Sequence, residues 1–380
     1  MASFQPFEQE RIMSTWEGRV DYNLSESGVH PITLRELVPN QSKMADLLDL
    51  SLGYPECNGD TELRQRIAAL YPGADVDNIL VTVGCAEANF VSTQTLVPRG
   101  EAIAMMVPNY MQIWGLAHNF GLERKAFHLR EEDHWGLDVD ELDRAVSKQT
   151  RLIAVCNPNN PTGHILTPSE IEAIVAAADR VGAWILADET YCGSERLSDT
   201  PTPSLWGRYE RVLVTSSLSK AYGLPGLRLG WIVAPAGTIA EIWARHDYIT
   251  ISAAMLANKL AALALSDNVR EMLIRRGRDF IRRGYPILEG WLHAHPETFS
   301  LVPPQAAAIA FVRYHLKMNS TDLAQRLIRE KSLFVVPGDC FCMDGFVRIS
   351  FGMPEDILVP ALNRLEEFVQ EANLKFRGAR

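Results

Sequence analysis

The sequence lacks the dense basic run of a nucleic-acid scaffold and the long apolar run of a membrane protein. Its 380 residues carry 37 Lys and Arg against 47 Asp and Glu, a formal net charge of −10, and this acidic balance disfavours binding to nucleic-acid phosphates. No window reaches the ~20 apolar residues of a membrane span, and residues 1–18 contain no signal-peptide core. We therefore expect a soluble protein that binds neither nucleic acid nor membrane.

Cysteine motifs are also missing. The six cysteines are too few for a disulfide scaffold in a chain of this length, and none forms Cys-x-x-Cys. Cys340 and Cys342 have no further Cys or His at the spacing of zinc ligands. This pattern predicts reduced thiols in a cytoplasmic protein, with no metal site. The five arginines within residues 275–283 come closest to a basic run, and we expect them to form a solvated helix face.

The length and the order of apolar runs predict two domains around an α/β core. Short apolar runs alternate with helical stretches between residues 79 and 233, which indicates a mostly parallel central sheet with helices on both faces. The last hundred residues read as a small α+β domain. We expect an N-terminal segment (1–45) that packs with the small domain, a large domain (46–280) and a small C-terminal domain (281–380).

The strand and helix candidates can be placed along the chain from these patterns. The predicted strands of the large domain are residues 79–83, 102–107, 152–156, 184–187, 212–215 and 229–233. The predicted helices include residues 62–70, with Thr61 as the cap, together with 86–97, 142–147 and 168–181.

The most informative stretch is residues 217–230, Ser-Leu-Ser-Lys-Ala-Tyr-Gly-Leu-Pro-Gly-Leu-Arg-Leu-Gly. It places Lys220 between two predicted buried strands, so its amine must be ion-paired, have a lowered pKa or be covalently occupied. The pattern Ser-x-Ser-Lys and Gly-x-x-Gly-x-Arg-x-Gly resembles the lysine segment of class I/II aminotransferases, which are pyridoxal phosphate (PLP) enzymes of fold type I. The resemblance implies that Lys220 binds PLP covalently and that Ser217 and Arg228 bind its phosphate.

Two further motifs follow predicted strands, where parallel sheets bind ligands. Gly84, Cys85 and Ala86 open a helix, whose free N–H groups face an anion; the family has a glycine and small or hydroxyl residues there, often Ser or Thr where this chain has Cys85. Asp188 ends an apolar strand and needs a cationic partner, which the resemblance identifies as the protonated ring nitrogen of PLP; Tyr191 is then a donor to the ring 3-oxygen. Taken singly, these motifs also suit a plain turn and a helix N-cap.

The loop Asn-Pro-Asn-Asn-Pro-Thr-Gly at 157–163 contains two Asn-Pro steps, which force a rigid turn. It matches the family motif Asn-Pro-x-Asn-Pro-Thr-Gly in full. The resemblance implies that Asn160 donates to the 3-oxygen beside Tyr191 and that Tyr110 stacks on the ring. It also implies that Tyr54 reaches the phosphate of a neighbouring subunit, so that two copies form a homodimer with a shared active site.

Arg348 is the expected binding group for the substrate. Apolar residues alternate along 346–351, which places Arg348 and Ser350 on the other side of a strand. A surface arginine would explain this position alone, but the family's Val-Arg-x-Ser makes Arg348, together with Asn160, the clamp for the α-carboxylate. The implied reaction moves the α-amino group of an L-amino acid to a keto acid through an external aldimine and a carbanion (quinonoid), with Lys220 as the general base.

The same residues also suit other fates of the carbanion. The segment Ser-Glu-Ser-Gly-Val-His-Pro at 25–31, with the lysine segment, is similar to capreomycidine synthase-like PLP enzymes, which act on a guanidino amino acid. This implies a lyase, cyclase or oxidase as the alternative, with Glu26 facing a cationic side chain, His30 as a second acid or base, and Gly28 beside the substrate. Otherwise Glu26 is a solvated loop residue and His30 a turn histidine, the interpretation that the residues alone favour.

Ligand-sensing regulators form a second class of fold type I proteins, and they carry a DNA-binding domain ahead of the PLP domain. Only some 20 residues precede the motif-bearing region here, and the chain is acidic. An enzyme is therefore the preferred interpretation.

Overall fold

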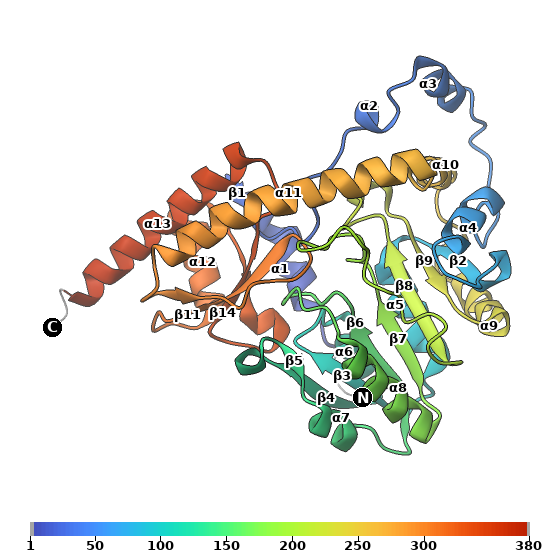
Figure 1. Ribbon diagram of the computed structural model, residues 1–380, viewed down its shortest axis with the longest axis horizontal. Coiled ribbons are helices and arrows are strands. Elements are labelled where there is room, and N and C mark those ends of the chain that lie inside the picture. Colours follow the sequence, from blue (N-terminus) through green and yellow to red (C-terminus); the bar gives the residue numbers. More distant parts are fainter. Residues whose placement is uncertain (1–3, 378–380) are drawn as a thin grey trace.

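A large, mostly parallel sheet forms the centre of the computed structural model, which describes residues 4–377, and the side chains of residues 4–371 (Figure 1). In spatial order its eight described strands are β2 (Ile79–Thr82), β9 (Gly230–Val233), β8 (Val212–Ser217), β7 (Trp184–Asp188), β6 (Thr150–Cys156), β3 (Ala102–Val107), β4 (Glu123–Arg130) and β5 (Gly136–Leu137). The five strands from β8 to β4 run parallel, whereas β2, β9 and β5 are antiparallel to their neighbours. The predicted α/β architecture is confirmed.

Alternate residues of the buried strands face opposite sides of this sheet. In β6, Ile153 and Val155 belong to one apolar cluster, and Leu152 and Ala154 belong to another, because successive side chains of a strand point to opposite faces. Helices cover both faces. Those on the Leu152 side are α5 (Gly84–Leu96), α6 (Gln112–Phe120) and α9 (Ala236–His246), and those on the Ile153 side are α4 (Thr61–Ala68), α7 (Val139–Ala145), α8 (Pro168–Val181) and α10 (Met255–Ala264).

The long helix α11 (Asp267–His293) connects the large sheet to a second, smaller one. Its early residues Leu273 and Ile274 pack in the core of the large sheet, and Ile281 and Leu288 pack in a separate core. Figure 1 shows α11 lying across both parts. The second core contains the antiparallel sheet β10 (Phe299–Ser300), β11 (Ile309–Tyr314), β14 (Phe346–Ser350) and β13 (Val336–Pro337), with α12 (Ser320–Lys331) and α13 (Glu355–Arg377).

The N-terminal residues contact both parts of the molecule. Strand β1 (Tyr22–Asn23) pairs in parallel with β12 (Leu333–Phe334), and helix α1 (Glu8–Trp16) places Met13 in the core of the large sheet. Helices α2 (Leu34–Leu37) and α3 (Gln41–Leu48) project from the body in Figure 1. None of the helices described is long and apolar enough to cross a membrane.

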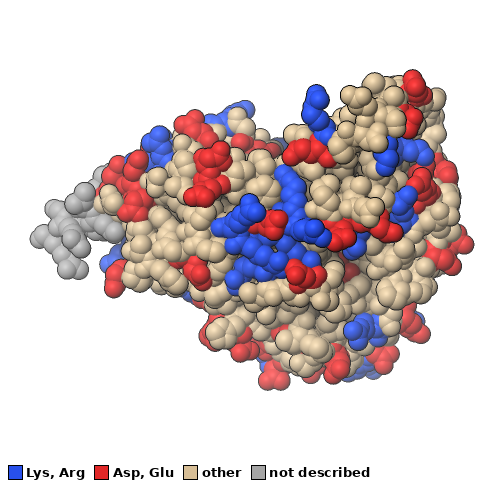
Figure 2. Space-filling model, turned by 45° about the horizontal axis from the view of Figure 1, so that its top comes forward, with Lys and Arg blue, Asp and Glu red and all other residues tan. Residues whose placement is uncertain are grey.

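The arginines of α11 were expected to form a solvated helix face, and the structure corrects this, because some of them bind to neighbouring loops. Arg276 donates to the carbonyl oxygens of His30 and Pro31, and Arg278 donates to the carbonyl oxygen of Asp199. Figure 2 shows the resulting concentration of basic side chains on the face that is turned forward there. These arginines bind loop carbonyls to the helix, and a charged donor makes such hydrogen bonds stronger than neutral ones.

Two helices begin earlier than the sequence suggested, because aspartates cap them. Asp60, and not Thr61, is the N-cap of α4, since its carboxylate accepts two backbone N–H groups of the first turn. Helix α7 begins at Val139 because Asp138 caps it. Aspartate is among the strongest N-cap residues, so each local cap determines where its helix begins.

Candidate active site

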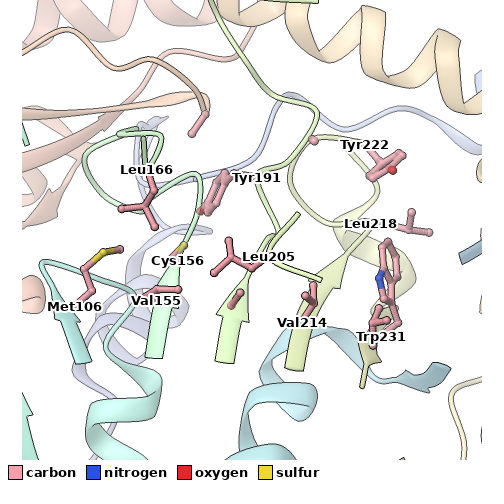
Figure 3. Packing of buried hydrophobic residues seen from close by; sticks show 14 of the residues in the cluster. Met106, Val155, Cys156, Leu166, Tyr191, Leu205, Val214, Leu218, Tyr222 and Trp231 are labelled. Carbon is pink, nitrogen blue, oxygen red and sulfur yellow. The ribbon is translucent and has the colours of Figure 1, made fainter. Parts of the chain in front are cut away.

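A cavity of about 440 Å³ lies at the carboxyl ends of the parallel strands. Cys156 ends β6, Asp188 ends β7 and Ser217 ends β8, and all three residues line the cavity. Figure 3 shows the buried apolar side chains around these strands, with Cys156 at the end of its strand and Tyr191 in the segment beyond the strand ends. Open parallel sheets bind their ligands at this edge, so the topology and the cavity identify the same candidate site.

Lys220 is half-buried and lines this cavity. Burial lowers the pKa of Lys220; Glu26 opposes this shift and Arg348 adds to it. Burial thus favours a lowered pKa, one of the three states that the sequence allowed for this amine, and covalent occupancy stays a prediction. A larger neutral fraction makes the amine a better nucleophile and a better base near neutral pH.

Asp188 is the buried carboxylate of the site, and it is only 9% exposed. It accepts hydrogen bonds from the Thr190 N–H (3.1 Å), the Asn89 amide (3.3 Å) and the Cys85 thiol (3.5 Å). Burial raises the pKa of Asp188, and these hydrogen bonds lower it. Cys85 thus directs its thiol at Asp188, a contact that the sequence did not suggest. A carboxylate in this position suits a protonated ring nitrogen.

Asn89 is a site residue that the sequence analysis missed. It is 2% exposed and lies one helical turn after Cys85 on α5. Its amide nitrogen donates to Asp188, and its amide oxygen accepts from the Thr215 hydroxyl at 2.9 Å. The four-residue spacing from Cys85 was the available signal, because it places both side chains on one face of the helix.

The start of α5 forms a narrow cradle beside Arg228. Gly84 has a φ of 77°, and a Cβ there would lie 2.8 Å from an Arg228 guanidinium nitrogen. A Cβ on Gly230 would lie 2.6 Å from the Gly84 carbonyl carbon. Both positions therefore require glycine. Cys85 and Ala86 line the cavity here together with Arg228, and free N–H groups beside an arginine suit a phosphate.

Arg348 lies behind Asn160, fully buried on β14. Its Nη1 donates to Asn160 Oδ1 at 3.0 Å, and its Nη2 donates to the Ser25 carbonyl oxygen at 2.5 Å. Its buried Nε has no hydrogen-bond partner among the described residues. The structure thus joins Asn160 and Arg348, as expected, but Arg348 itself does not line the cavity, and its Nε is buried without a partner in the part of the chain that the structure describes. Tyr191 lies close by; burial raises the pKa of Tyr191, and Arg348 opposes that shift.

Helix α1 contributes to the cavity wall, which the sequence gave no reason to expect. The Tyr110 hydroxyl donates to Glu10 Oε1 at 2.8 Å, and the Tyr110 ring contacts Phe7 edge to face at 5.0 Å. Gln9 and Met13 of the same helix also line the cavity. Tyr110 is therefore held from the side of α1, with its ring at the cavity.

The remaining predicted residues have different positions. Glu26 lines the cavity, and Gly28 lies beside it, where a Cβ would meet the lysine-segment backbone at 2.9 Å. His30 corrects the alternative role as a second acid or base and agrees with the preferred interpretation as a turn histidine, because it does not line the cavity and its ring packs against Phe280 with centroids 5.8 Å apart. Tyr54 is 96% exposed and lies outside the cavity of its own chain. Its expected role in a partner subunit stays a prediction.

The donor set suits PLP. A buried carboxylate, Asp188, is available for the ring nitrogen, and the cradle at Gly84 and Arg228 is available for the phosphate. The amine of Lys220 lies in the same cavity as the ring of Tyr110. Each group meets a different chemical feature of the cofactor, namely its ring nitrogen, phosphate, aldehyde carbon and aromatic face.

Comparison with known proteins agrees with this geometry. Capreomycidine synthase from Streptomyces vinaceus is 31% identical over 366 residues, covering 94% of this chain and 91% of that protein. Aspartate aminotransferase from Pyrococcus horikoshii is 26% identical, covering 89% and 94%.

Two solved structures share the fold over almost the whole chain. A PLP-dependent aminotransferase from Streptococcus suis has a TM-score of 0.91 and 28% identity, covering 97% of this chain and 98% of that one. The PLP-dependent cyclase OrfR has a TM-score of 0.87 and 25% identity, covering 98% of each chain. The model of the family "Aminotransferase class I and II" matches residues 28–365. The chain therefore belongs to the class I and II aminotransferase family, and its cofactor is pyridoxal 5′-phosphate.

Proposed function

We propose that the protein is an aminotransferase that moves the α-amino group of an L-amino acid to a keto acid. The observation that carries the proposal is a single cavity that holds the Lys220 amine and the Asp188 carboxylate, with Arg348 hydrogen-bonded behind Asn160. These groups suit the amino end, the cofactor ring and the carboxylate end of an α-amino acid, respectively.

The cofactor-binding residues have separate tasks. When bound, PLP supplies an electron-withdrawing ring that stabilises the charge left after the α-proton is removed. Asp188 accepts a hydrogen bond from the ring nitrogen and keeps it protonated. The N–H groups of Cys85 and Ala86, with Ser217 and Arg228, bind the phosphate; all four residues line the cavity.

The catalytic proton moves through Lys220. Its lowered pKa leaves more neutral amine to take the α-proton of the substrate and to return it in the second half of the transfer. We assign the α-carboxylate to Arg348, which lies behind the cavity residue Asn160 and would orient the α-carbon. Tyr191 and Asn160 donate to the ring 3-oxygen.

The second candidate is a lyase, cyclase or oxidase that acts on a guanidino or other specialised amino acid. The identity of 31% to a protein named capreomycidine synthase and the structural likeness to a PLP-dependent cyclase favour it. Both candidates begin with removal of the α-proton by Lys220, so they use the same residues up to that step.

A cytoplasmic homodimer with a shared active site is part of the proposal. Leu48, Leu52 and Tyr54 are 80%, 87% and 96% exposed in the single chain. Neighbouring apolar residues with such exposure are typical of an interface. The six cysteines are free, which supports a reducing compartment.

The test combines a variant with a product panel. Lys220→Ala should lose the visible absorbance of covalently bound cofactor and the activity, whereas the exposed-lysine control Lys148→Ala should keep both. A panel of amino acids is then assayed for keto acid, ammonia and peroxide separately. Keto acid formation that requires a keto-acid acceptor supports transfer. Turnover by Lys220→Ala, or ammonia release without an acceptor, contradicts the first candidate.

A further inference from the structure

The cavity holds more negative charge than the cofactor and the α-amino acid group require. Asp188 has a role at the ring nitrogen, but three glutamates, Glu10, Glu17 and Glu26, also line the cavity. The phosphate and the α-carboxylate are themselves anions, and Arg228 and Arg348 are the cations assigned to bind them. None of the three glutamates forms a salt bridge with a described residue, and Lys220, whose charge acts on Glu17, is the amine that the proposed reaction itself uses.

These glutamates lie close enough to act on one another and on the lysine. Burial, then Glu26 and Glu10, raise the pKa of Glu17, and Lys220 opposes that shift. Glu10 already accepts the hydroxyl of Tyr110, which leaves the carboxylates of Glu17 and Glu26 for a ligand. Glutamates on a solvated surface usually avoid such crowding, because like charges close together are destabilising.

An independent observation comes from Gln9, which precedes Glu10 on α1. The Gln9 side chain is 2% exposed and lines the cavity. Its Oε1 has no hydrogen-bond partner among the described residues, and its Nε2 contacts only Met13 Sδ at 3.9 Å. A buried acceptor without a donor is unfavourable. A donor brought by the ligand would satisfy it.

We propose that Gln9, Glu17 and Glu26 form a subsite for the cationic side chain of the substrate, of the guanidinium type. This proposal rests on the proposed function, because it assumes that the α-amino acid end lies at Lys220. A guanidinium carries five N–H donors and no acceptor. The amide oxygen of Gln9 and the two carboxylates can only accept hydrogen bonds, and a guanidinium can only donate them. The subsite and the ligand are therefore complementary in charge and in hydrogen bonding.

The position of the subsite also sets the length of the side chain. Glu17 and Glu26 are exposed, so they lie at the cavity mouth, whereas Asp188 lies buried at its base and Arg348 lies buried behind Asn160. A substrate bound at both ends therefore needs a long side chain. Because solvent screens exposed charges, we expect a preference of about tenfold for a charged over an uncharged side chain, and not a much larger one.

The test uses two ligands that differ only in charge and cannot react. 5-Guanidinopentanoate is arginine without its amino group, and 5-ureidopentanoate is its neutral analogue. Calorimetric titration of the PLP-loaded protein should show about tenfold tighter binding of the guanidino acid. Glu17→Gln/Glu26→Gln should bring the two affinities within about twofold of each other. Glu8→Gln removes a charge from the same helix outside the cavity, and it should keep the preference.

Equal affinities in the unmodified protein would overturn the subsite, and so would a preference that survives the double substitution in a folded variant. Circular dichroism establishes that each variant is folded. The proposed function is read separately, from the visible absorbance of the cofactor bound through Lys220. Loss of that absorbance contradicts the function but not the charge preference, whereas intact absorbance with equal affinities contradicts the subsite alone.

Discussion

The Asn89 side-chain amide donates to Asp188 Oδ2 at 3.3 Å, from a helix to the end of a strand 99 positions further along the chain. The Thr215 hydroxyl donates a hydrogen bond to the amide oxygen of the same Asn89 side chain. This arrangement fixes the rotamer of Asn89 and therefore the direction in which Asp188 presents its carboxylate. Asn89 is a positioning residue, because it acts on the cofactor only through Asp188.

Replacement of Asn89 should weaken cofactor binding. Asn89→Ala removes one hydrogen bond to a charged group, so the dissociation constant of PLP should rise roughly tenfold or more. The pH dependence of the cofactor's absorbance should also shift, because the pKa of Asp188 rises when a hydrogen bond that lowers it is lost. Ser92→Ala is the matched control, since the buried Ser92 hydroxyl on the same helix has no partner among the described residues. Equal behaviour of both variants would contradict the role.

Arg348→Lys should separate substrate binding from cofactor binding. Lysine keeps the charge but loses the planar fork that reaches Asn160 and Ser25 together. We expect KM for the amino acid to rise about 100-fold, with an unchanged dissociation constant for PLP. Steady-state kinetics and cofactor titration measure the two quantities. Arg364→Lys, at a partly exposed arginine of α13, is the control. A KM within threefold of the original value would exclude Arg348 as the carboxylate clamp.

Glu189 should make the protein less stable at high pH. Burial raises the pKa of Glu189 to about 8, while the unfolded carboxyl ionises near its ordinary value of 4.5. The native state therefore binds more protons between these values. Its stabilising contribution is complete below pH 4.5 and is lost as the pH rises through 8. Urea unfolding at pH 5, 7 and 9 should show this loss.

Glu189→Gln should flatten that pH dependence and raise the free energy of unfolding at pH 9 relative to the original protein. The amide oxygen can still accept from the Leu205 N–H and the Ser204 hydroxyl, as Glu189 Oε1 does at 2.7 and 2.9 Å. Glu172→Gln, on the exposed side of α8, supplies the surface control. An unchanged slope in Glu189→Gln would show that another group carries the pH dependence.

Tyr54 should act on the partner's site and not on its own. Hybrid dimers that pair a Lys220→Ala subunit with a Tyr54→Phe subunit test this. If Tyr54 acts across the interface, one site in the hybrid has both Lys220 and Tyr54, and it should bind PLP with the original affinity. If Tyr54 acts within its own chain, no site has both residues. Cofactor titration of the purified hybrid distinguishes the two outcomes, and weak binding at both sites would refute the shared site.

The sequence by itself determined the α/β class and the places of six strands along the chain, and with the family resemblance it gave the candidate cofactor-binding positions. This was possible because the signals are local. Strand ends, the Asn-Pro turn and the glycines of the lysine segment restrict the backbone within a few residues. Lys220, Asp188 and Asn160 stood out through these local motifs and through the family resemblance that the motifs carry, and the structure places all three around one cavity.

Only the tertiary structure decided what covers that cavity and which charges act there. The Tyr110 hydroxyl donates a hydrogen bond to Glu10, which is 100 positions away in the sequence, and Arg348 donates one to Asn160, which is 188 positions away. His30, which the resemblance offered as a second acid or base, packs against Phe280 outside the cavity. Burial and pKa depend on every element that packs around a group, including elements remote in sequence. Helix α1 and its C-cap carry no motif, and Glu10 and Glu17 acquire a proposed role only because the fold places them at the same cavity as Lys220.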